Sequence, residues 1–282
     1  MIMLRNEGEE GGSQDPGIKS LMISMERHLS STARVSEKQA FEAQQLFYDA
    51  MAATTAKEQE KLIHKVLNLD PTNVDALLYA AQNSGLSGEL HIEVLRKIVA
   101  LGEKNLGPKA FKEFAGAFWG FIETRPYMRA REILAEQLRA AGRIDEAIAE
   151  WEAMLKLNPN DNQGVRYNLL PCYLMLKRLD KAGQLFAKYD GEYLYSAVFS
   201  WGRVLERLLL EDFPGAKKAL TVSRKQNQHM EAYLKGNRKP PKRSPEVYAP
   251  GSKEEAVCFA EPLSEAWKRH PAALKWLAEQ KK

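Results

Sequence analysis

Turn-forming residues and side-chain amides lie close together in LNPNDNQGVRYNLLP, residues 157–171. Clustered Asn and Asp oxygens are the kind of ligand that Ca²⁺ takes in a binding loop. Such a loop alternates its oxygen ligands around a central glycine and ends in a glutamate, whereas the residues after the glycine here are Val165, Arg166 and Tyr167. The pattern therefore predicts no metal site.

The same stretch fits the boundary between two helices. Asn158-Pro159 would end one helix, and the side chains of residues 160–162 would cap the free backbone amides of the next, which we expect to start near Gln163. Pro171 falls inside that second helix, where it removes one backbone hydrogen bond and predicts a kink. The kink either fits the helix around a neighbour, which we favour, or acts as a functional hinge.

Patterns typical of catalytic sites are absent from the sequence. No pair of histidines has the i, i+4 spacing of a helical zinc site, no glycine-rich phosphate loop follows an apolar strand, and no serine lies in a GxSxG turn. An enzyme whose site is assembled from distant residues is left as an alternative. We predict no enzymatic activity, no cofactor and no metal. The histidines considered are His28, His64, His91, His229 and His270.

Charge and cysteine content limit the class of protein. The chain has 282 residues with 41 basic and 37 acidic side chains, and its formal net charge of +4 is too balanced to predict nucleic-acid binding. Cys172 and Cys258 have no second thiol at metal or redox spacing, which favours a reducing compartment. No run approaches the roughly 18 apolar residues of a membrane span, and glutamates stand where a signal peptide needs an apolar segment. We expect a cytoplasmic protein without a membrane association.

Apolar residues recur with a helical period over most of the chain, and no segment shows the alternation of a strand. We predict an all-α chain. The clearest unit runs from Met128 to Pro159 as two helices joined at Gly142-Arg143, and Ala147 is small enough to allow a close helix crossing. Alanine recurs at nearly the same interval, at Ala182 and Ala216. In its 34-residue plan this unit resembles a tetratricopeptide repeat.

Three to four such hairpins, with at least one irregular pair between residues 72 and 125, predict an α-solenoid with a C-terminal helical cap. Residues 1–17 have a composition that cannot order itself, and residues 18–35 predict a docking helix and linker, or else a mobile tail. The helical-repeat domain is predicted over residues 36–230, a basic and proline-rich strap over 231–251, and capping helices over 252–282. The repeat domain and the capping helices each begin with a capping-box pattern.

Stacked hairpins present the first helix of each pair on an inner surface, which offers a groove to a peptide or a partner helix. Two glutamates on the first helix of the clearest unit would repel a terminal carboxylate, so a basic or mixed-charge peptide is favoured over the tail that some tetratricopeptide domains clamp. We predict a non-catalytic scaffold that binds a protein or peptide partner in this groove. The predicted partner-binding residues are Arg129, Glu132, Glu136, Arg139, Arg166, Tyr167 and Trp201.

The segment KGNRKPPKRSPEVYAPGS, residues 235–252, combines five cations with four prolines and two glycines, which predicts an extended, solvated linker. Nucleic-acid binding through this segment is the alternative. It is not favoured, because Tyr248 is the only aromatic residue and no series of stacking side chains is interleaved with the cations. Such binding would show a steep dependence on salt.

Five stretches together resemble the bacterial relatives of the suppressor-of-tumorigenicity-seven family, helical-repeat proteins without an established activity. They are FWGFIETRPYMRAR, LNPNDNQGVRYNLLP, AYLKG, YAPGSKEEA and ALKWL, and they lie in this order between residues 118 and 277. The resemblance implies a scaffold or interaction role and supplies no catalytic residues. The positions that match its motifs are Glu123, Arg125, Tyr127, Arg129, Asn160, Asn162, Gln163, Arg166 and Tyr167.

Overall fold

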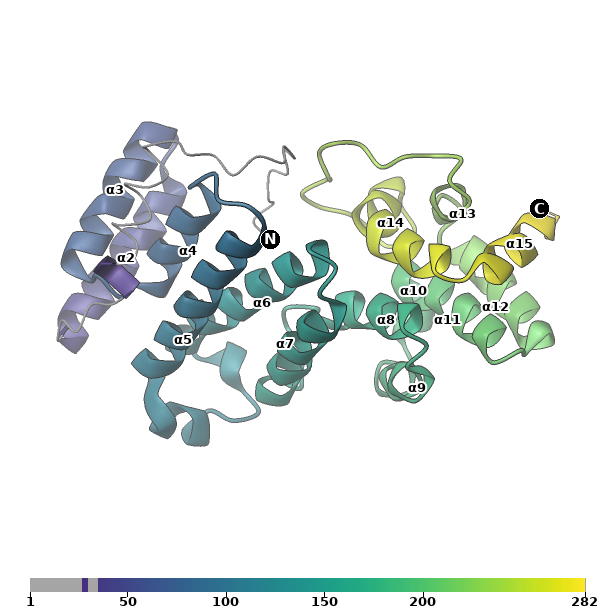
Figure 1. Cartoon of the computed structure of the whole chain (residues 1–282), viewed down its shortest axis with the longest axis horizontal. Helices are drawn as coiled ribbons and strands as arrows, with labels where there is room; N and C mark the ends of the chain where they lie inside the picture. The colour runs from purple at the N-terminus through teal and green to yellow at the C-terminus, as the bar shows by residue number, and fades with distance from the viewer. Residues whose placement is uncertain (1–26, 30–34, 282) are drawn as a thin grey trace. The chain divides into compact units, whose positions relative to one another are not determined.

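The computed structural model describes residues 27–29 and 35–281 (Figure 1). The predicted tail over residues 1–17, and most of the predicted docking segment over residues 18–35, lie outside the described residues. Contacts divide the chain after Asn162 into two compact units, here called the N-terminal unit and the C-terminal unit. The boundary falls inside the range 36–230 that was predicted as one repeat domain.

The N-terminal unit begins with a helical hairpin, α2 (Glu37–Ala52) and α3 (Ala56–Leu69). The capping box predicted at the start of α2 is confirmed, because the Ser36 hydroxyl accepts from the Gln39 backbone N–H at 3.3 Å while the Gln39 side chain accepts from the Ser36 N–H at 3.2 Å. These two bonds satisfy donors that an uncapped helix would leave free. The first helix is therefore defined by its own sequence.

The next pair, α4 (Val74–Gln82) and α5 (Gly88–Glu113), is the irregular one predicted between residues 72 and 125. Gly107 interrupts α5 with a φ of 65°, a backbone conformation that glycine adopts without steric cost, and a proline follows it. Two short 3₁₀ helices, η1 (Phe118–Gly120) and η2 (Ile122–Thr124), then lead into the next hairpin.

The last hairpin of the N-terminal unit is α6 (Arg125–Ala140) and α7 (Ile144–Leu157). The turn contains Gly142 with a φ of 76°, which closes the C-terminal end of α6. Ala147 is fully buried, as expected of a small residue at a close helix crossing, and Trp151 is fully buried one turn further along.

The C-terminal unit repeats this plan with α8 (Arg166–Met175) and α9 (Leu179–Lys188), and again with α11 (Ala197–Leu209) and α12 (Phe213–Gln226). A single helical turn, α10 (Glu192–Tyr195), separates the two hairpins. Ala182 in α9 and Ala216 in α12 are both fully buried. The predicted recurrence of a small residue in the second helix of these three pairs, α7, α9 and α12, is confirmed.

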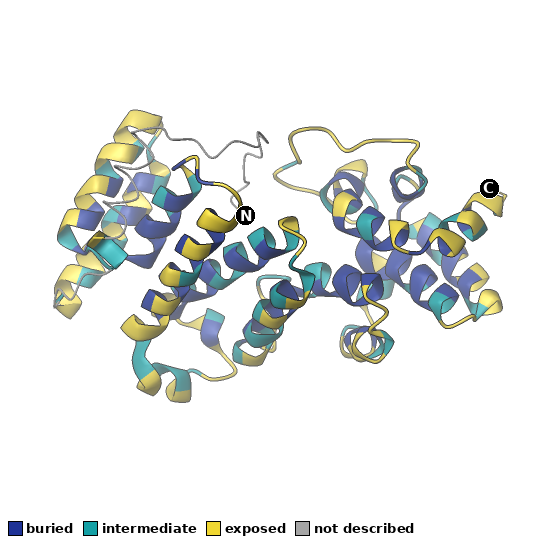
Figure 2. Cartoon of the chain, viewed as in Figure 1, coloured by how far each residue is buried: buried dark blue, intermediate teal, exposed yellow. Residues whose placement is uncertain are grey.

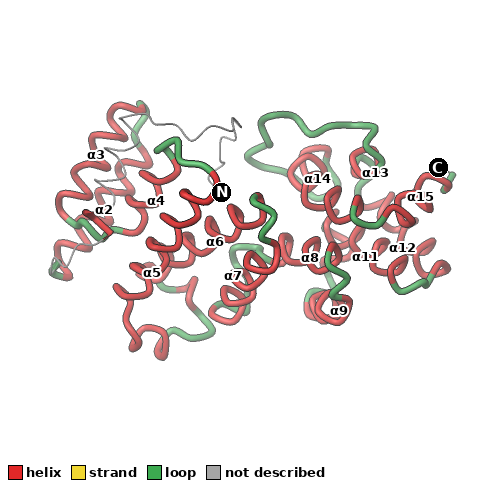
Figure 3. Tube along the Cα trace, viewed as in Figure 1, coloured by secondary structure: helices red, strands yellow, loops and turns green. Residues whose placement is uncertain are grey.

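The chain ends in α13 (Met230–Leu234), a long loop, α14 (Lys253–Lys268) and α15 (Pro271–Glu279). Because α13 occupies the first residues of the range 231–251, the extended strap is shorter than predicted and begins after α13. Within the described residues every regular element is helical and no strand occurs (Figure 3). The fold is the all-α helical repeat that the sequence predicts.

Buried positions lie on the helix faces that meet within each unit (Figure 2). Several buried positions are acidic, and the least exposed of them is Glu255 at the start of α14, which is 1% exposed. Its carboxylate accepts from the backbone N–H groups of Ala197 and Gly251, both at 2.7 Å, and from Asn227 Nδ2 at 2.9 Å. These donors lie at the start of α11, at the end of α12 and just before α14. They compensate the charge of Glu255 and connect three helices of the C-terminal unit.

The predicted capping of α8 by residues 160–162 is wrong. The helix begins at Arg166 and not near Gln163, and its N-cap residue Val165 makes no side-chain capping bond. Asn162 Oδ1 instead accepts from Asn158 Nδ2 at 3.1 Å. The amides of this stretch therefore stabilise the loop itself.

Candidate functional site

The start of α8 presents Arg166 and Tyr167, two of the residues predicted to contact a partner. Gly164 precedes them with a φ of 75°, and a Cβ atom at this position would lie 3.1 Å from Tyr167 Cδ2. Only glycine suits both this conformation and this spacing. The glycine of the polar stretch therefore allows the tyrosine ring to fold back against the loop.

Glu192, the first residue of α10, accepts hydrogen bonds from both side chains. Arg166 Nε and Nη2 donate to Glu192 Oε1 at 3.1 and 2.8 Å, and the Tyr167 hydroxyl donates to Glu192 Oε2 at 2.8 Å. Arg166 Nη2 also donates to the Tyr167 hydroxyl at 2.8 Å. We call these three residues the Arg166 cluster. A carboxylate held by an arginine fork and a phenol has one defined orientation.

Aromatic rings hold the Arg166 cluster in place. The Arg166 guanidinium lies 4.3 Å from the centre of the Tyr167 ring and 5.1 Å from that of Tyr189. The Tyr167 ring packs edge-on against Phe199 of α11 and at a tilt against Phe259 of α14. The cluster is thereby fixed to α11 and α14 of the C-terminal unit.

Burial raises the pKa of Tyr167 well above its ordinary value, and the hydrogen bond to Glu192 adds to the increase. The phenol therefore remains a protonated donor at neutral pH. A phenol in this state positions Glu192 and does not act as a base. The arrangement suits recognition by hydrogen bonds and ring contacts.

A hollow of about 290 Å³ lies beside the Arg166 cluster, lined by Tyr189, Gly191, Glu192 and Tyr195. Tyr195, which lines the hollow, is 66% exposed, and its neighbour in sequence Leu194 is 59% exposed. Sequence reasoning missed Glu192 and the two tyrosines of the hollow. The run YDGEYLY, residues 189–195, was the available signal, because it places aromatic residues in a short linker where no core would bury them.

The other predicted residues of the groove lie on α6 in the N-terminal unit. Arg129, Glu132, Glu136 and Arg139 recur at intervals of three and four residues and so share one face of the helix. We call them the α6 stripe. All four are half-buried.

Within the α6 stripe, Arg129 is engaged inside the protein. Its Nε donates to Asp75 Oδ1 at 2.8 Å and its Nη2 donates to Asp75 Oδ2, while Gln44 Nε2 donates to the same carboxylate at 2.8 Å. Asp75 is 2% exposed, so its charge depends on these donors. Arg129 therefore connects α6 to α4, which corrects the expectation that it faces a partner.

Glu136 of the α6 stripe has a raised pKa. Burial and the neighbouring charge of Glu132 raise its pKa to about 7, and Arg139 partly opposes the increase. Glu132 and Glu136 lie one helical turn apart, where like charges repel. A cation bound to this face would favour the ionised form of Glu136.

Trp201 belongs to the core. Its side chain is completely buried, and its indole N–H donates to the Asn227 carbonyl at 3.3 Å. The prediction that Trp201 contacts a partner is wrong, because the ring fills the interior between α11 and the end of α12.

The side chains that could bind a metal ion or act as a nucleophile were considered in the described part of the chain. Residues 27–29 and 35–281 contain no group of three or more His, Cys, Asp or Glu side chains that could hold a metal ion. Burial raises the pKa of the Cys258 thiol, which disfavours the reactive thiolate, and Cys172 is buried. No helix of the described residues is long and apolar enough to cross a membrane.

A family model described as tetratricopeptide repeat matches residues 138–193. The matched segment includes α7, α8 and α9, and it contains all three residues of the Arg166 cluster. No curated protein and no solved structure matches the chain. Together with the helical hairpins, the match supports a tetratricopeptide-repeat protein.

Proposed function

We propose that the chain is a non-catalytic scaffold for protein–protein interaction, and that its C-terminal unit binds a peptide or partner helix at the Arg166 cluster and the adjoining hollow. Tetratricopeptide repeats generally mediate such interactions, and the match covers the helices that carry the cluster. The observation that carries the proposal is the exposure of Leu194 and Tyr195 beside an oriented carboxylate.

The composition of this surface supports recognition of an amphipathic segment. Tyrosine and arginine are the residue types that most often contribute large binding energies at interfaces. Leu194 and Tyr195 offer an apolar anchor, and Glu192 offers a charged contact next to it. A helix or peptide with an apolar face and a polar edge makes both kinds of contact at once.

For the α6 stripe we propose a basic or mixed-charge partner segment. Glu132 contributes a negative charge to this face, Glu136 adds a second above its pKa of about 7, and Arg139 lies one turn further along. Arg129 and Trp201 are not included, because the first holds Asp75 and the second is buried. The stripe and the Arg166 cluster are separate surfaces in this proposal.

Site-directed photocrosslinking tests the proposed surface. The full chain with p-benzoylphenylalanine at position 195 is irradiated in a native lysate, and adducts are identified by mass spectrometry. The control places the same residue at Phe213, which is 50% exposed on α12 of the same unit. We expect a defined adduct from position 195 and none from position 213. Equal adducts from both positions, or none from either, would contradict the proposal.

A second variant tests whether the cluster positions the partner. Glu192→Gln keeps the shape of the side chain but removes its charge, so Arg166 loses its ionic partner. We expect the adduct at position 195 to decrease severalfold. An undiminished adduct would assign recognition to the apolar residues alone.

We also propose that the chain is related to the suppressor-of-tumorigenicity-seven family and that it is a cytoplasmic protein. The resemblance to the suppressor-of-tumorigenicity-seven relatives is supported by its five sequence stretches, and the cytoplasmic location by the two cysteines, which are far apart in the sequence. Fractionation of cells that express the tagged chain tests the location, and recovery with membranes or in the medium would contradict it.

A further inference from the structure

Charge is distributed unevenly along the chain. Residues 163–282 contain 22 Lys and Arg against 13 Asp and Glu, an excess of nine positive charges. Residues 1–162 contain 19 basic and 24 acidic side chains, an excess of five negative charges. The nearly balanced total of +4 therefore hides a strongly basic C-terminal unit.

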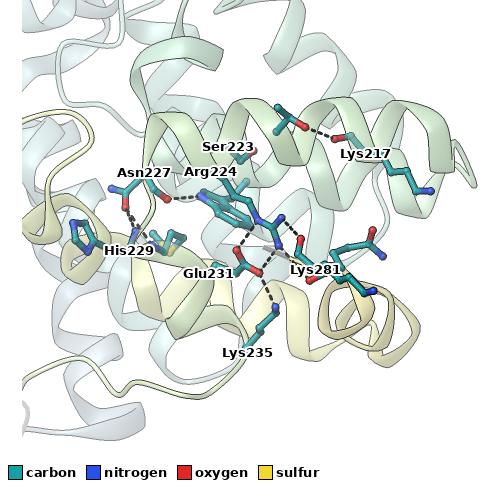
Figure 4. Close-up of polar contacts among 12 residues, drawn as sticks. Lys217, Ser223, Arg224, Asn227, His229, Glu231, Lys235 and Lys281 are labelled. Carbon is teal, nitrogen blue, oxygen red and sulfur yellow. Dashed lines mark hydrogen bonds and ion pairs between the residues drawn. The ribbon is translucent and has the colours of Figure 1, made fainter.

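Many cations of the C-terminal unit are neutralised by neighbouring carboxylates. Arg224 donates through Nε and Nη2 to Glu231 at 2.8 and 2.9 Å, and Lys235 Nζ lies 2.6 Å from the same carboxylate (Figure 4). These contacts lower the pKa of Glu231 although its burial acts in the opposite direction. Lys235 is thus the last cation before the strap, and it is paired.

The strap, residues 236–250, differs in this respect. Arg238, Lys239, Lys242 and Arg243 fall within six positions, and all four are exposed. No carboxylate of the described residues lies within ion-pair distance of any of them, and Glu246 is the only acidic residue of the strap itself. The strap therefore concentrates uncompensated positive charge.

Both ends of the strap are attached to the C-terminal unit. The Arg238 N–H donates to the Ala232 carbonyl at 3.0 Å, and the Arg238 guanidinium lies 5.7 Å from the centre of the Tyr233 ring. At the other end, the Tyr248 ring packs edge-on against Phe259, 5.4 Å between ring centres. Three prolines between these attachments further restrict the backbone, so less conformational entropy is lost when a ligand binds.

We propose that the strap binds the phosphate backbone of nucleic acid without reading its sequence. A dense row of phosphates releases bound counterions when several cations approach it, and this release supplies affinity without shape complementarity. Arginine also matches phosphate oxygens with two parallel hydrogen bonds. The absence of interleaved aromatic residues excludes a stacking platform and leaves contact with the phosphates.

An acidic peptide fits the strap less well. Peptide affinity depends on apolar anchors in the centre of an interface, while exposed ion pairs contribute little by themselves. Val247, 81% exposed, and Tyr248, 39% exposed, are the exposed large apolar side chains of the strap. Neither stands between the four cations.

Fluorescence anisotropy tests the proposal with the full chain. The probes are a labelled 20-nucleotide oligo-dT and a labelled 20-base-pair duplex, titrated at NaCl concentrations from 50 to 200 mM. With four phosphate contacts, the affinity for the single strand should fall by about 50-fold over this range. A salt-independent affinity, or no binding of either probe at 50 mM NaCl, would overturn the proposal.

A matched pair of variants separates the strap from net charge. The strap variant changes all four cations to glutamine. Because it loses the counterion release from four phosphate contacts, we expect its affinity at 50 mM NaCl to fall at least about tenfold. The control removes four exposed lysines of the N-terminal unit, and its affinity should stay within about twofold. An equal loss in both would overturn the proposal. The strap changes are R238Q, K239Q, K242Q and R243Q, and the control changes are K57Q, K61Q, K65Q and K104Q.

A competitor distinguishes phosphate from carboxylate. The labelled duplex is displaced by unlabelled duplex or by oligo-glutamate at equal total charge. The duplex carries one charge per about 1.7 Å of its axis and extended oligo-glutamate one per about 3.4 Å, so we expect oligo-glutamate to be at least roughly tenfold less effective. Equal displacement would assign the strap to an acidic peptide and overturn the proposal. Because the strap lies outside the Arg166 cluster, crosslinking from position 195 should be unchanged in the strap variant.

Discussion

Two arginines selected from the sequence for the same role have different roles in the structure. Arg129 on α6 pairs with Asp75, which is 2% exposed, and Arg166 on α8 pairs with Glu192, whose side chain is 22% exposed. A fully buried carboxylate cannot lose its cation without a large cost, whereas a carboxylate that keeps some exposure can be partly hydrated in its place. The burial of the acidic partner therefore sets how much stability the loss of each arginine costs.

The first prediction tests this difference through stability. Arg129→Ala leaves Asp75 buried and unpaired, and we expect the N-terminal unit to lose about 3–5 kcal/mol of its free energy of unfolding. Hydrogen exchange in peptides from α4 and α6 measures the loss within this unit. The matched control, Arg129→Ala with Asp75→Ala, removes both charges and should be less destabilised. If the double variant were the less stable of the two, the pair would not be the source of the effect.

The second prediction compares the α6 stripe with the Arg166 cluster, since only the stripe places two carboxylates one turn apart. The pKa of Glu136 is raised to about 7 in the folded chain, above its ordinary value of 4.5. Between these values the unfolded chain ionises while the folded chain keeps its proton, so the N-terminal unit should lose stability as the pH rises from 4.5 to 7 and change little above that.

Glu136→Gln cannot ionise, so it removes this loss. We expect the variant to gain about 1–2 kcal/mol relative to the parent chain at pH 8 and nothing at pH 4, because the half-buried carboxyl keeps part of its hydration. Urea unfolding at pH 4, 6 and 8 measures the difference. Glu93→Gln, an exposed change on α5, is the control and should show no such trend. A gain in stability that is the same at all three pH values would mean that Glu136 is destabilised by steric packing and not by the cost of ionising its carboxyl group.

The third prediction concerns the Arg166–Glu192 pair, whose side chains are 16% and 22% exposed. Arg166→Ala removes the charged partner of Glu192 but leaves the Tyr167 hydroxyl bond, so we expect the C-terminal unit to lose only about 1 kcal/mol. The measurement is hydrogen exchange in peptides from α8 and α10. A loss as large as that of Arg129→Ala would remove the distinction between the two arginines.

The smallest expected effect is that of Leu194→Ala combined with Tyr195→Ala. Both side chains are largely exposed, so the free energy of unfolding should change by less than about 0.5 kcal/mol. Crosslinking of a partner from a benzophenone placed at position 191 should nevertheless be lost. A clear loss of stability would show that these side chains pack against the protein itself and do not form a partner-binding surface.

The sequence predicted the fold well because its signals are local. Ala147, Ala182 and Ala216 recur at the spacing of one hairpin, and each is fully buried. The capping box at Ser36 depends only on Gln39, three residues away, and it forms as predicted. Such features need no knowledge of distant residues.

The site was predicted only in part because its contacts are distant in sequence. Glu192 lies 26 residues after Arg166, and Asp75 lies 54 residues before Arg129. No spacing rule connects such pairs, since the length of the intervening helices decides which side chains meet. The capping of α8 failed for a related reason, because the amides of the polar stretch could bond either to the helix or to one another.

The sequence by itself determined the helical hairpins, the irregular pair and the basic composition of the strap. These follow from the helical period, from turn chemistry and from charge, which act over a few residues. Only the tertiary structure decided that Trp201 is buried, that Arg129 is committed to Asp75, and that the strap cations are uncompensated. The reason is physical: burial and ion pairing depend on which helices pack together, and that is a property of the whole fold.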